Sequence, residues 1–312
     1  FFPELVYVRP QGQIEKRDSL EGSAFIAFPV DETVIYPDYR HNTVELGKIQ
    51  SSIDSVRSDM DITITSVWLK GYASPESPYA HNKELAIGRT AALKKFIQQL
   101  YQFEDEVITT DYEPEDWVGL RHYVEQSDLE HRTEMIALID GNLEPDAKEL
   151  KIKQTYPAEY RFLLQNCYPT LRHTDYRIVY TIRSYSDVED IRRIIRERPQ
   201  KLNLNEFYLV AQEYEPGTDE FTEVFETAVR MFPDDTIANL NAANAAMRRG
   251  DLTAAKRYLA KTDNSPEAVY ARGALAIRQK DYNSARRYLN EAKSLGSEQA
   301  GITLEQLEKG KH

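Results

Sequence analysis

The sequence predicts an α+β protein in which a domain of mixed strands and helices is followed by an all-α domain of repeated helix pairs. Residues 22–186 alternate between strand-like and helix-like hydrophobic patterns, whereas only helical patterns occur from about residue 187 onward. An internal repeat with an offset of 30 residues lies in the second part. The length of 312 residues suits two domains, each large enough to bury its own core.

Composition and charge exclude several classes of protein. Hydrophobic residues make up 41% of the chain and charged residues 29%, which is typical of globular proteins. No apolar run approaches the ~20 residues of a membrane-spanning helix, so we expect no transmembrane segment. The net charge of −12 disfavours a nucleic-acid partner. Cys167 is the single cysteine, which excludes an internal disulfide, and beside Leu163 and Leu164 we expect it to be a small buried side chain rather than a nucleophile.

The first 21 residues are expected to be an N-terminal extension or the remnant of a preceding domain. The sequence begins at Phe1 without a methionine and shows no signal-peptide pattern. We therefore expect a trimmed form, from which any export signal or lipid anchor has been removed.

The first domain, residues 22–186, is expected to contain strands and amphipathic helices in the order β-α-β-α-β, a helical insertion and a last strand. Strands are expected at 23–30, 61–73, 106–112 and 176–183, and helices at 38–56, 82–100, 129–140 and 157–166. In the β-branched run "DITITSVWLKGYA", which ends near Gly71, strict alternation sets Ile62, Ile64, Ser66 and Trp68 against Thr63, Thr65, Val67 and Leu69. The helices must cover one face of the sheet.

The second domain, residues 187–312, repeats a helix-turn-helix unit. "AMRRGDLTAAKRYLAKTD" matches "AIRQKDYNSARRYLNEAK", with Gly250 or Lys280 in the turn and Ala255 or Ala285 where the helices pack closely. Because one such unit cannot bury its apolar face, several must stack. Residues 203–235 supply an earlier unit, and 297–310 a capping helix. The repeat resembles the tetratricopeptide repeat family over residues 200–310, although its offset is shorter than the usual ~34 residues. The resemblance implies a protein-binding scaffold.

A second motif surrounds the turn after the strand that ends near Gly71. Asn82 follows this glycine by eleven residues, Leu85 by fourteen and Arg89 by eighteen. This spacing resembles the OmpA C-terminal domain family across residues 22–186. "EDWVGLRHYVE" and "YPTLRHTDYRIVY" resemble the variant of that domain found in Bacteroidetes. The resemblance implies a β-α-β-α-β sandwich that binds peptidoglycan by gripping the diaminopimelate of the stem peptide.

The resemblance also supplies candidate ligand-binding residues. They are Ser74, Glu76, Asn82, Arg89 and Arg177. An amino-acid zwitterion needs a carboxylate for its ammonium and a guanidinium for its carboxylate, and Arg89 suits the second task because its planar fork pairs bidentately. Asn82 is either a ligand or a plain cap of the helix that follows. Arg177, two residues after Asp175, matches an arginine of the family's last strand.

The sequence departs from the family where the ligand's ammonium should bind. Ser74 stands in place of the family's Asp, and Ser77 in place of its Gly. Glu76 either supplies the missing negative charge or points into water. Arg89 also has a structural alternative, an ion pair with Glu84 or Asp175.

Other chemistry has little support, and we expect no enzyme, cofactor or metal. The six histidines lack metal-ligand spacing, and neither a nucleophile elbow nor a phosphate loop is present. Carboxylates at 111–117, including Glu113 and Glu115 beside Trp117, would suit a glycosidase only if two of them lay across a cleft.

The repeats carry a local excess of basic residues. Residues 246–293 contain eleven Lys or Arg against five Asp or Glu. Four arginines recur in register, namely Arg248, Arg257, Arg278 and Arg287. They form either a solvated face or a surface for an acidic partner peptide.

The expected function is that of a non-enzymatic protein of the cell envelope, in the periplasm or associated with the outer membrane. Its first domain would associate with peptidoglycan and its repeats with an envelope protein. The alternative is an OmpA-like fold without peptidoglycan binding, which serves as a structural scaffold of a surface complex.

Overall fold

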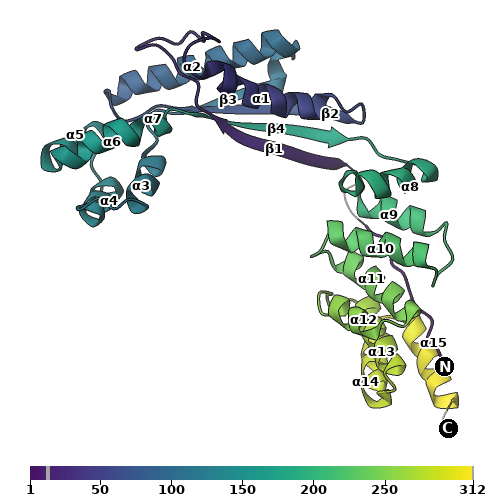
Figure 1. Cartoon of the computed structure of the whole chain (residues 1–312). Helices are drawn as coiled ribbons and strands as arrows, with labels where there is room; N and C mark the ends of the chain where they lie inside the picture. Colours follow the sequence, from purple (N-terminus) through teal and green to yellow (C-terminus); the bar gives the residue numbers. More distant parts are fainter. Residues whose placement is uncertain (12–14, 311–312) are drawn as a thin grey trace. The chain divides into compact units, whose positions relative to one another are not determined.

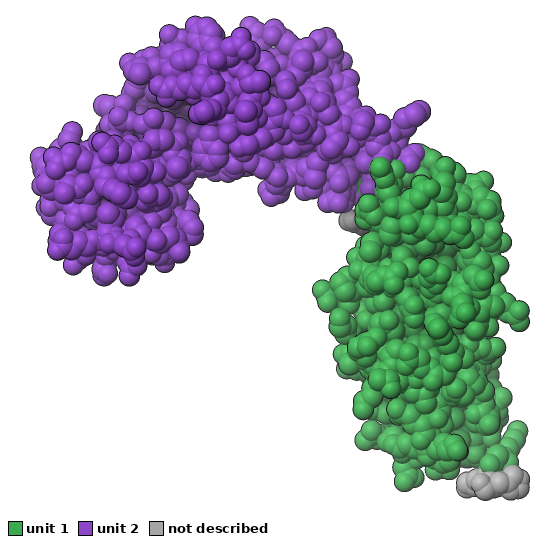
Figure 2. Space-filling model, viewed as in Figure 1, with its two compact units in different colours: residues 1–16, 183–312 green, residues 17–182 purple. Residues whose placement is uncertain are grey.

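The computed structural model describes residues 1–11 and 15–310. It divides into two compact units, coloured separately in Figure 2: the sheet unit, residues 17–182, and the helical unit, residues 1–16 together with 183–312. The sheet unit contains a four-stranded mixed sheet, so the chain is α+β. None of the helices in the described residues is long and apolar enough to span a membrane.

The sheet brings the turn after its second strand next to the residues that precede its fourth. The strands are β1 (Lys16–Ala24), β2 (Ile62–Tyr72), β3 (Ile108–Glu113) and β4 (Thr174–Ile182), in the spatial order β1-β4-β2-β3. Strand β2 pairs parallel to β3 and antiparallel to β4. Gly71 therefore lies opposite Thr174, and the two loops that follow and precede these residues are neighbours.

The strand expected at 23–30 was wrong: β1 ends at Ala24, and the residues after it are not a strand. Asn42 explains the difference. Its side chain accepts a hydrogen bond from the Ala27 N–H at 2.7 Å and donates one to the Ala27 carbonyl at 2.9 Å. The backbone groups of Ala27 are therefore satisfied by a side chain and not by a sheet ladder, while Ile26 still packs in the core of the sheet unit.

Two helices, α1 (Asn42–Arg57) and α2 (Tyr79–Tyr101), cover one face of the sheet (Figure 1). The core between them includes Ile53, Val67, Leu69 and Ile97. The strict alternation expected in β2 fails because the β2–β4 register shifts between Ile64 and Ser66, as at a β-bulge. Ile64 therefore packs against the same core as Val67 and Leu69.

A helical insertion with its own small core lies between β3 and β4. It consists of α3 (Trp117–Glu125), α4 (Arg132–Asp140), α5 (Pro145–Thr155), α6 (Pro157–Asn166) and α7 (Tyr168–Leu171), after a short 3-10 helix at Asp105–Val107. The expected helices correspond to α4 and α6, whereas α3, α5 and α7 were not predicted. Cys167 is buried in this core, as expected, and burial raises the pKa of its thiol to about 12.

The helical unit contains the expected pairs of helices. Its helices are α8 (Val188–Glu197), α9 (Leu204–Ala211), α10 (Asp219–Met231), α11 (Thr236–Arg249), α12 (Leu252–Leu259), α13 (Pro266–Arg278), α14 (Tyr282–Ser294) and α15 (Glu298–Lys309), with a 3-10 turn at Pro199–Lys201. Gly250 and Lys280 occupy equivalent turns with φ of 91° and 62°. Ala255 and Ala285 are fully buried, which confirms that these positions allow close helix packing.

The first nine residues, here called the strap, belong to the helical unit. The strap forms no helix or strand and runs past α10 and α11 toward α15 (Figure 1). Its Val8 and Val6 backbones are hydrogen-bonded by Asn241 and Asn244 of α11. These residues, expected to be an extension or a remnant, are therefore packed against the repeats.

Candidate functional site

A cavity of about 420 Å³ lies in the sheet unit, where β2 ends and α2 begins. Its walls come from the loop after β1, the loop after β2, the first turns of α2 and the chain before β4. The lining includes Phe25, Ile26, Phe28, Asp31, Ala73, Ser74, Glu76, Ser77, Asn82, Leu85, Arg89, Pro169 and Arg172. Four of the five residues singled out from the sequence therefore share one cavity.

Gly71 allows α2 to approach β2 closely beneath this cavity. A Cβ atom at this position would lie 1.9 Å from Thr90 Oγ1 and 3.2 Å from the carbonyl oxygen of Ala86, both on α2. Only a residue without a side chain fits there unless Thr90 moves. The glycine of the motif thus sets the distance between strand and helix, and the loop that joins them forms one wall of the cavity.

Arg89 has no acidic ion-pair partner among residues 1–11 and 15–310. Its Nε donates a hydrogen bond to the Glu32 carbonyl at 3.1 Å, and its guanidinium carbon lies 4.9 Å from the ring centre of Phe28. Burial and repulsion by Arg172 lower the pKa of this guanidinium, and attraction by Asp31 opposes the change. The remaining N–H groups of Arg89 are therefore available to a ligand carboxylate.

The structural alternative for Arg89, an ion pair with Glu84 or Asp175, is not what the structure contains. Asp175 accepts hydrogen bonds from Ser23 Oγ at 2.6 Å and is bonded to His173 at 2.9 Å. The carboxylate of Asp175 is thus part of another network, near the start of β4.

Ser74 and Glu76 are both bonded to Arg172. The Nε of Arg172 donates to Ser74 Oγ at 3.0 Å, and its Nη2 donates to a carboxylate oxygen of Glu76. Ser74 is buried, whereas the side chain of Glu76 is 51% exposed. Glu76 therefore neither points freely into water nor stands unpaired beside the cavity.

Asn82 does not cap α2, whose N-cap residue is Pro78 without a side-chain hydrogen bond. The buried Asn82 amide instead donates to the Ser77 carbonyl at 2.7 Å and to Glu115 Oε1 at 2.9 Å. It thereby ties the loop after β2 to the start of α3. The first helical N–H of α2, that of Tyr79, is satisfied by Asp146 at 2.8 Å.

Glu115 and Glu113 are both engaged in contacts inside the sheet unit. Glu115 is buried and accepts hydrogen bonds from Asn82 and, at 2.7 Å, from the indole Nε1 of Trp117. Burial raises the pKa of Glu115, against the effect of these hydrogen bonds. Glu113 lies 3.8 Å from the ammonium of Lys70.

Arg177 lies outside the cavity. Its Nε donates to Glu21 at 2.6 Å on the neighbouring strand, and its guanidinium carbon is 5.4 Å from the Trp68 ring centre. The structure therefore does not bring Arg177 together with the other four candidates.

Arg172 is a charged cavity residue that was not singled out from the sequence. It occurs within the quoted motif "YPTLRHTDYRIVY", directly before the last strand. The antiparallel register that sets Gly71 opposite Thr174 brings it beside Ser74 and Glu76. Only knowledge of this strand pairing could have identified it.

His173 forms a second network beside the cavity. Its Nε2 lies 3.0 Å from Asp116 and its Nδ1 2.9 Å from Asp175, and its ring stacks on Tyr72 with 4.2 Å between ring centres. Burial lowers the pKa of His173, but the hydrogen bond to Asp116 and the attraction of both carboxylates outweigh it, so the pKa is raised. Protonation of both nitrogens satisfies both carboxylates.

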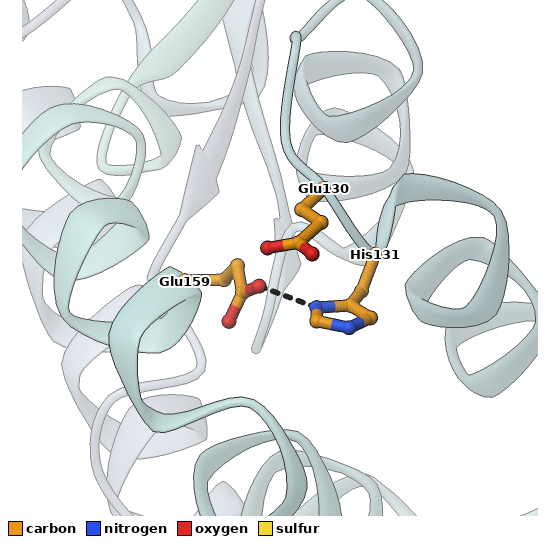
Figure 3. A group of neighbouring side chains, drawn as sticks. All are labelled: Glu130, His131 and Glu159. Atoms are coloured by element: carbon orange, nitrogen blue, oxygen red, sulfur yellow. Dashed lines mark hydrogen bonds and ion pairs between the residues drawn. The ribbon is translucent and has the colours of Figure 1, made fainter.

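One group of side chains in the described part of the chain could offer three donor atoms to a metal ion: Glu130, His131 and Glu159, shown in Figure 3. Their donor atoms lie within 4.8 Å of one another. His131 Nδ1 is hydrogen-bonded to Glu159 at 2.6 Å, and Glu130 is exposed. The His131–Glu159 pair accounts for the geometry without an ion.

The four arginines of the repeats separate into two kinds. Arg248 and Arg278 face the Phe2 ring of the strap, at 5.3 and 4.2 Å from its centre. Arg257 and Arg287 lie over the rings of their own neighbours, Tyr258 and Tyr288. The first pair therefore already holds a segment of this chain.

Comparisons with protein-family models and with curated proteins found no match. The chemistry of the cavity is therefore the basis for assigning a function.

Proposed function

We propose that the cavity of the sheet unit binds a small ligand through a carboxylate, and that this ligand is the diaminopimelate of the peptidoglycan stem peptide. The observation that carries the proposal is Arg89, a partly buried guanidinium that faces the cavity without an acidic partner in the described residues. An unpaired charge of this kind costs stability unless a ligand completes it. The spacing of Gly71, Asn82 and Arg89, which resembles the OmpA C-terminal family, supports the choice of ligand.

Each residue of the cavity has a distinct role in this proposal. Arg89 pairs with the ligand carboxylate through two parallel N–H···O bonds. Asn82 and Glu115 hold the loop after β2 in place. The ligand ammonium is received by Glu76, which must then share its charge with Arg172. Because one carboxylate serves two cations, binding is weaker than at a site with a dedicated acid.

The chain as a whole is proposed to be a non-enzymatic protein of the cell envelope, in the periplasm and associated with the outer membrane. Its helical unit, which resembles tetratricopeptide repeats, binds an envelope protein. The proposal includes neither a cofactor nor a metal, and it includes no nucleic-acid partner, because the net charge is −12.

Two muropeptides test the proposal. Diaminopimelate carries a carboxylate on its side chain where lysine has none, so the two stem peptides differ in the group that Arg89 is proposed to bind. We expect the diaminopimelate muropeptide to shift the backbone amide resonances of residues 72–90, and the lysine muropeptide to leave them unchanged. Equal shifts with both, or none at millimolar ligand, would refute the proposal.

A second candidate function is a scaffold in a surface complex, without peptidoglycan binding. The observation in its favour is that Ser74 replaces an acid and that Arg172 already engages both Ser74 and Glu76. Under this hypothesis the chain recovers protein partners, and no cell wall, from envelope extracts. Recovery of cell wall without a protein partner would contradict it.

A further inference from the structure

The main chain of the strap is hydrogen-bonded by side chains of the repeats, while its Leu5, Val6 and Val8 side chains pack against the repeat cores. Asn241 accepts from the Val8 N–H and donates to the Val8 carbonyl, each at 2.8 Å. Asn244 donates to the Val6 carbonyl at 2.7 Å, and the Tyr270 hydroxyl donates to the Glu4 carbonyl at 2.6 Å. The bonded positions are two residues apart, as expected where an extended chain presents one edge to its partner.

Two aromatic side chains of the strap make further specific contacts. The Tyr7 ring lies between Phe221 and Phe225, with ring centres 5.0 and 5.5 Å away. Phe2 lies against the guanidinium groups of two equivalent residues of the repeat, Arg248 and Arg278. These contacts select aromatic residues five positions apart and require no charge on the bound segment.

The residues that hold the strap are themselves buried and polar. Asn241, Asn244 and Tyr270 are each 2% exposed. Such groups need hydrogen-bond partners, and the main chain of the strap provides them. The surface is therefore shaped for an extended peptide backbone rather than for the flat face of another helix.

Tyr7 fits the space between Phe221 and Phe225 except at its hydroxyl group. Its hydroxyl oxygen is buried without a hydrogen-bond partner in the described residues, and burial raises the pKa of this phenol above its ordinary value. A phenylalanine would fill the same space without burying an unsatisfied hydroxyl. The site thus accepts an aromatic side chain at this position without requiring tyrosine.

We propose that this surface is a peptide-binding site and that the strap is its built-in ligand, which a separate extended peptide with aromatic residues five positions apart can replace. The inference rests on the partner-binding role proposed above for the helical unit and specifies the chemistry of the partner. A partner must compete with a segment tethered to the same chain, whose effective concentration is on the order of millimolar. The strap therefore sets a threshold for binding in trans.

The test uses the full chain with a protease recognition sequence in place of residues 12–14, so that the strap can be cut free after folding. The probe is a fluorescent peptide with the sequence of residues 1–11, "FFPELVYVRPQ". We expect the cut protein to take up the probe and the uncut protein to bind it at least tenfold more weakly. A probe with Tyr7→Phe should bind at least as tightly as the parent, and a probe with Tyr7→Ala at least tenfold more weakly.

A matched protein variant, Asn241→Ala, should weaken probe binding to the cut protein about tenfold without changing its circular dichroism. Two results would overturn the proposal: the cut protein stays folded and takes up no probe at millimolar concentration, or the uncut protein is a dimer that cutting converts to monomers. If the cut protein binds the probe but recovers no protein partner from envelope extracts, the result would count against the proposed envelope function and not against the peptide-binding site.

Discussion

Replacing Arg89 by glutamine separates a ligand-binding role from a structural one. The side chain makes one described hydrogen bond, from Nε to the Glu32 carbonyl, and no acidic partner is present in the described residues. Loss of that bond costs about 0.5–1.5 kcal/mol. Removing a partly buried positive charge that Arg172 repels opposes the loss. We therefore expect the free energy of unfolding to change by less than about 1 kcal/mol.

The effect on ligand binding should be much larger. A charge-assisted hydrogen bond contributes about 1.5–3 kcal/mol, so Arg89→Gln should weaken binding of the diaminopimelate muropeptide by roughly tenfold to a hundredfold. The assay is calorimetric titration, combined with urea unfolding of the same sample. Arg177→Gln is the matched control, because this arginine lies outside the cavity in an exposed pair with Glu21. It should leave the affinity unchanged.

The opposite pattern would refute this reasoning. If Arg89 were one half of a buried ion pair, its removal would destabilise the fold by about 3–5 kcal/mol. A loss of that size with an unchanged affinity, or an equal loss of affinity in Arg177→Gln, would show that the cavity does not use Arg89 to bind the ligand.

Three further predictions follow from the sheet unit. Gly71→Ala should destabilise the fold by about 1–3 kcal/mol in urea unfolding, because the added Cβ would collide with α2. The control is Gly47→Ala, in α1 with open space around it, which should stabilise the fold by about 0.5–1 kcal/mol. Equal effects of the two substitutions would contradict the close approach of α2 to β2. Because the pKa of His173 is raised in the folded state, its protonation stabilises the fold at pH values below the unfolded-state pKa of about 6.5, and this contribution is lost as pH rises through the folded-state pKa. The difference in unfolding free energy between wild type and His173→Gln should therefore shrink from pH 5 to pH 9. A difference that grows with pH would contradict this prediction. Ser74→Asp, beside Arg172, should release Glu76 and tighten muropeptide binding about tenfold in the same titration; weaker binding would show that the carboxylate excludes the ligand.

The elements that were predicted from the sequence are those whose hydrophobic pattern is local. Helices α1 and α2 and the repeated pairs bury one face at helical spacing, and β2 is rich in β-branched residues. The hydrophobic pattern predicts the wrong structure where a side chain distant in the sequence takes the backbone hydrogen bonds. "SAFIAFPV" alternates like a strand, but Asn42 takes the hydrogen bonds of Ala27. Helix α5 gave no signal because Ile152 is its one buried residue.

The candidate site was predictable to the same extent. The spacing from Gly71 to Arg89 is local, so four cavity residues could be named from the sequence. Arg172 could not, because the pairing of β2 with β4 brings it there across about a hundred residues of chain. The strap could not be predicted either, because its main-chain hydrogen bonds join residues more than 230 positions apart and its own sequence has no hydrophobic period.

Arg172 holds the acid of the loop after β2 at the edge of the cavity. Ser74 carries no charge, and the charged residues that line the cavity are Asp31, Arg40, Glu76, Arg89 and Arg172. Glu76 is bonded to Arg172, which neutralises the charge of that arginine within the protein, whereas Arg89 has no ion-pair partner in the described residues. The negative charge of this loop lies on Glu76, two residues after Ser74, and is shared with Arg172. If this shared charge limits binding of the ligand ammonium, Ser74→Asp should strengthen binding of the diaminopimelate zwitterion more than binding of a ligand that has a carboxylate alone.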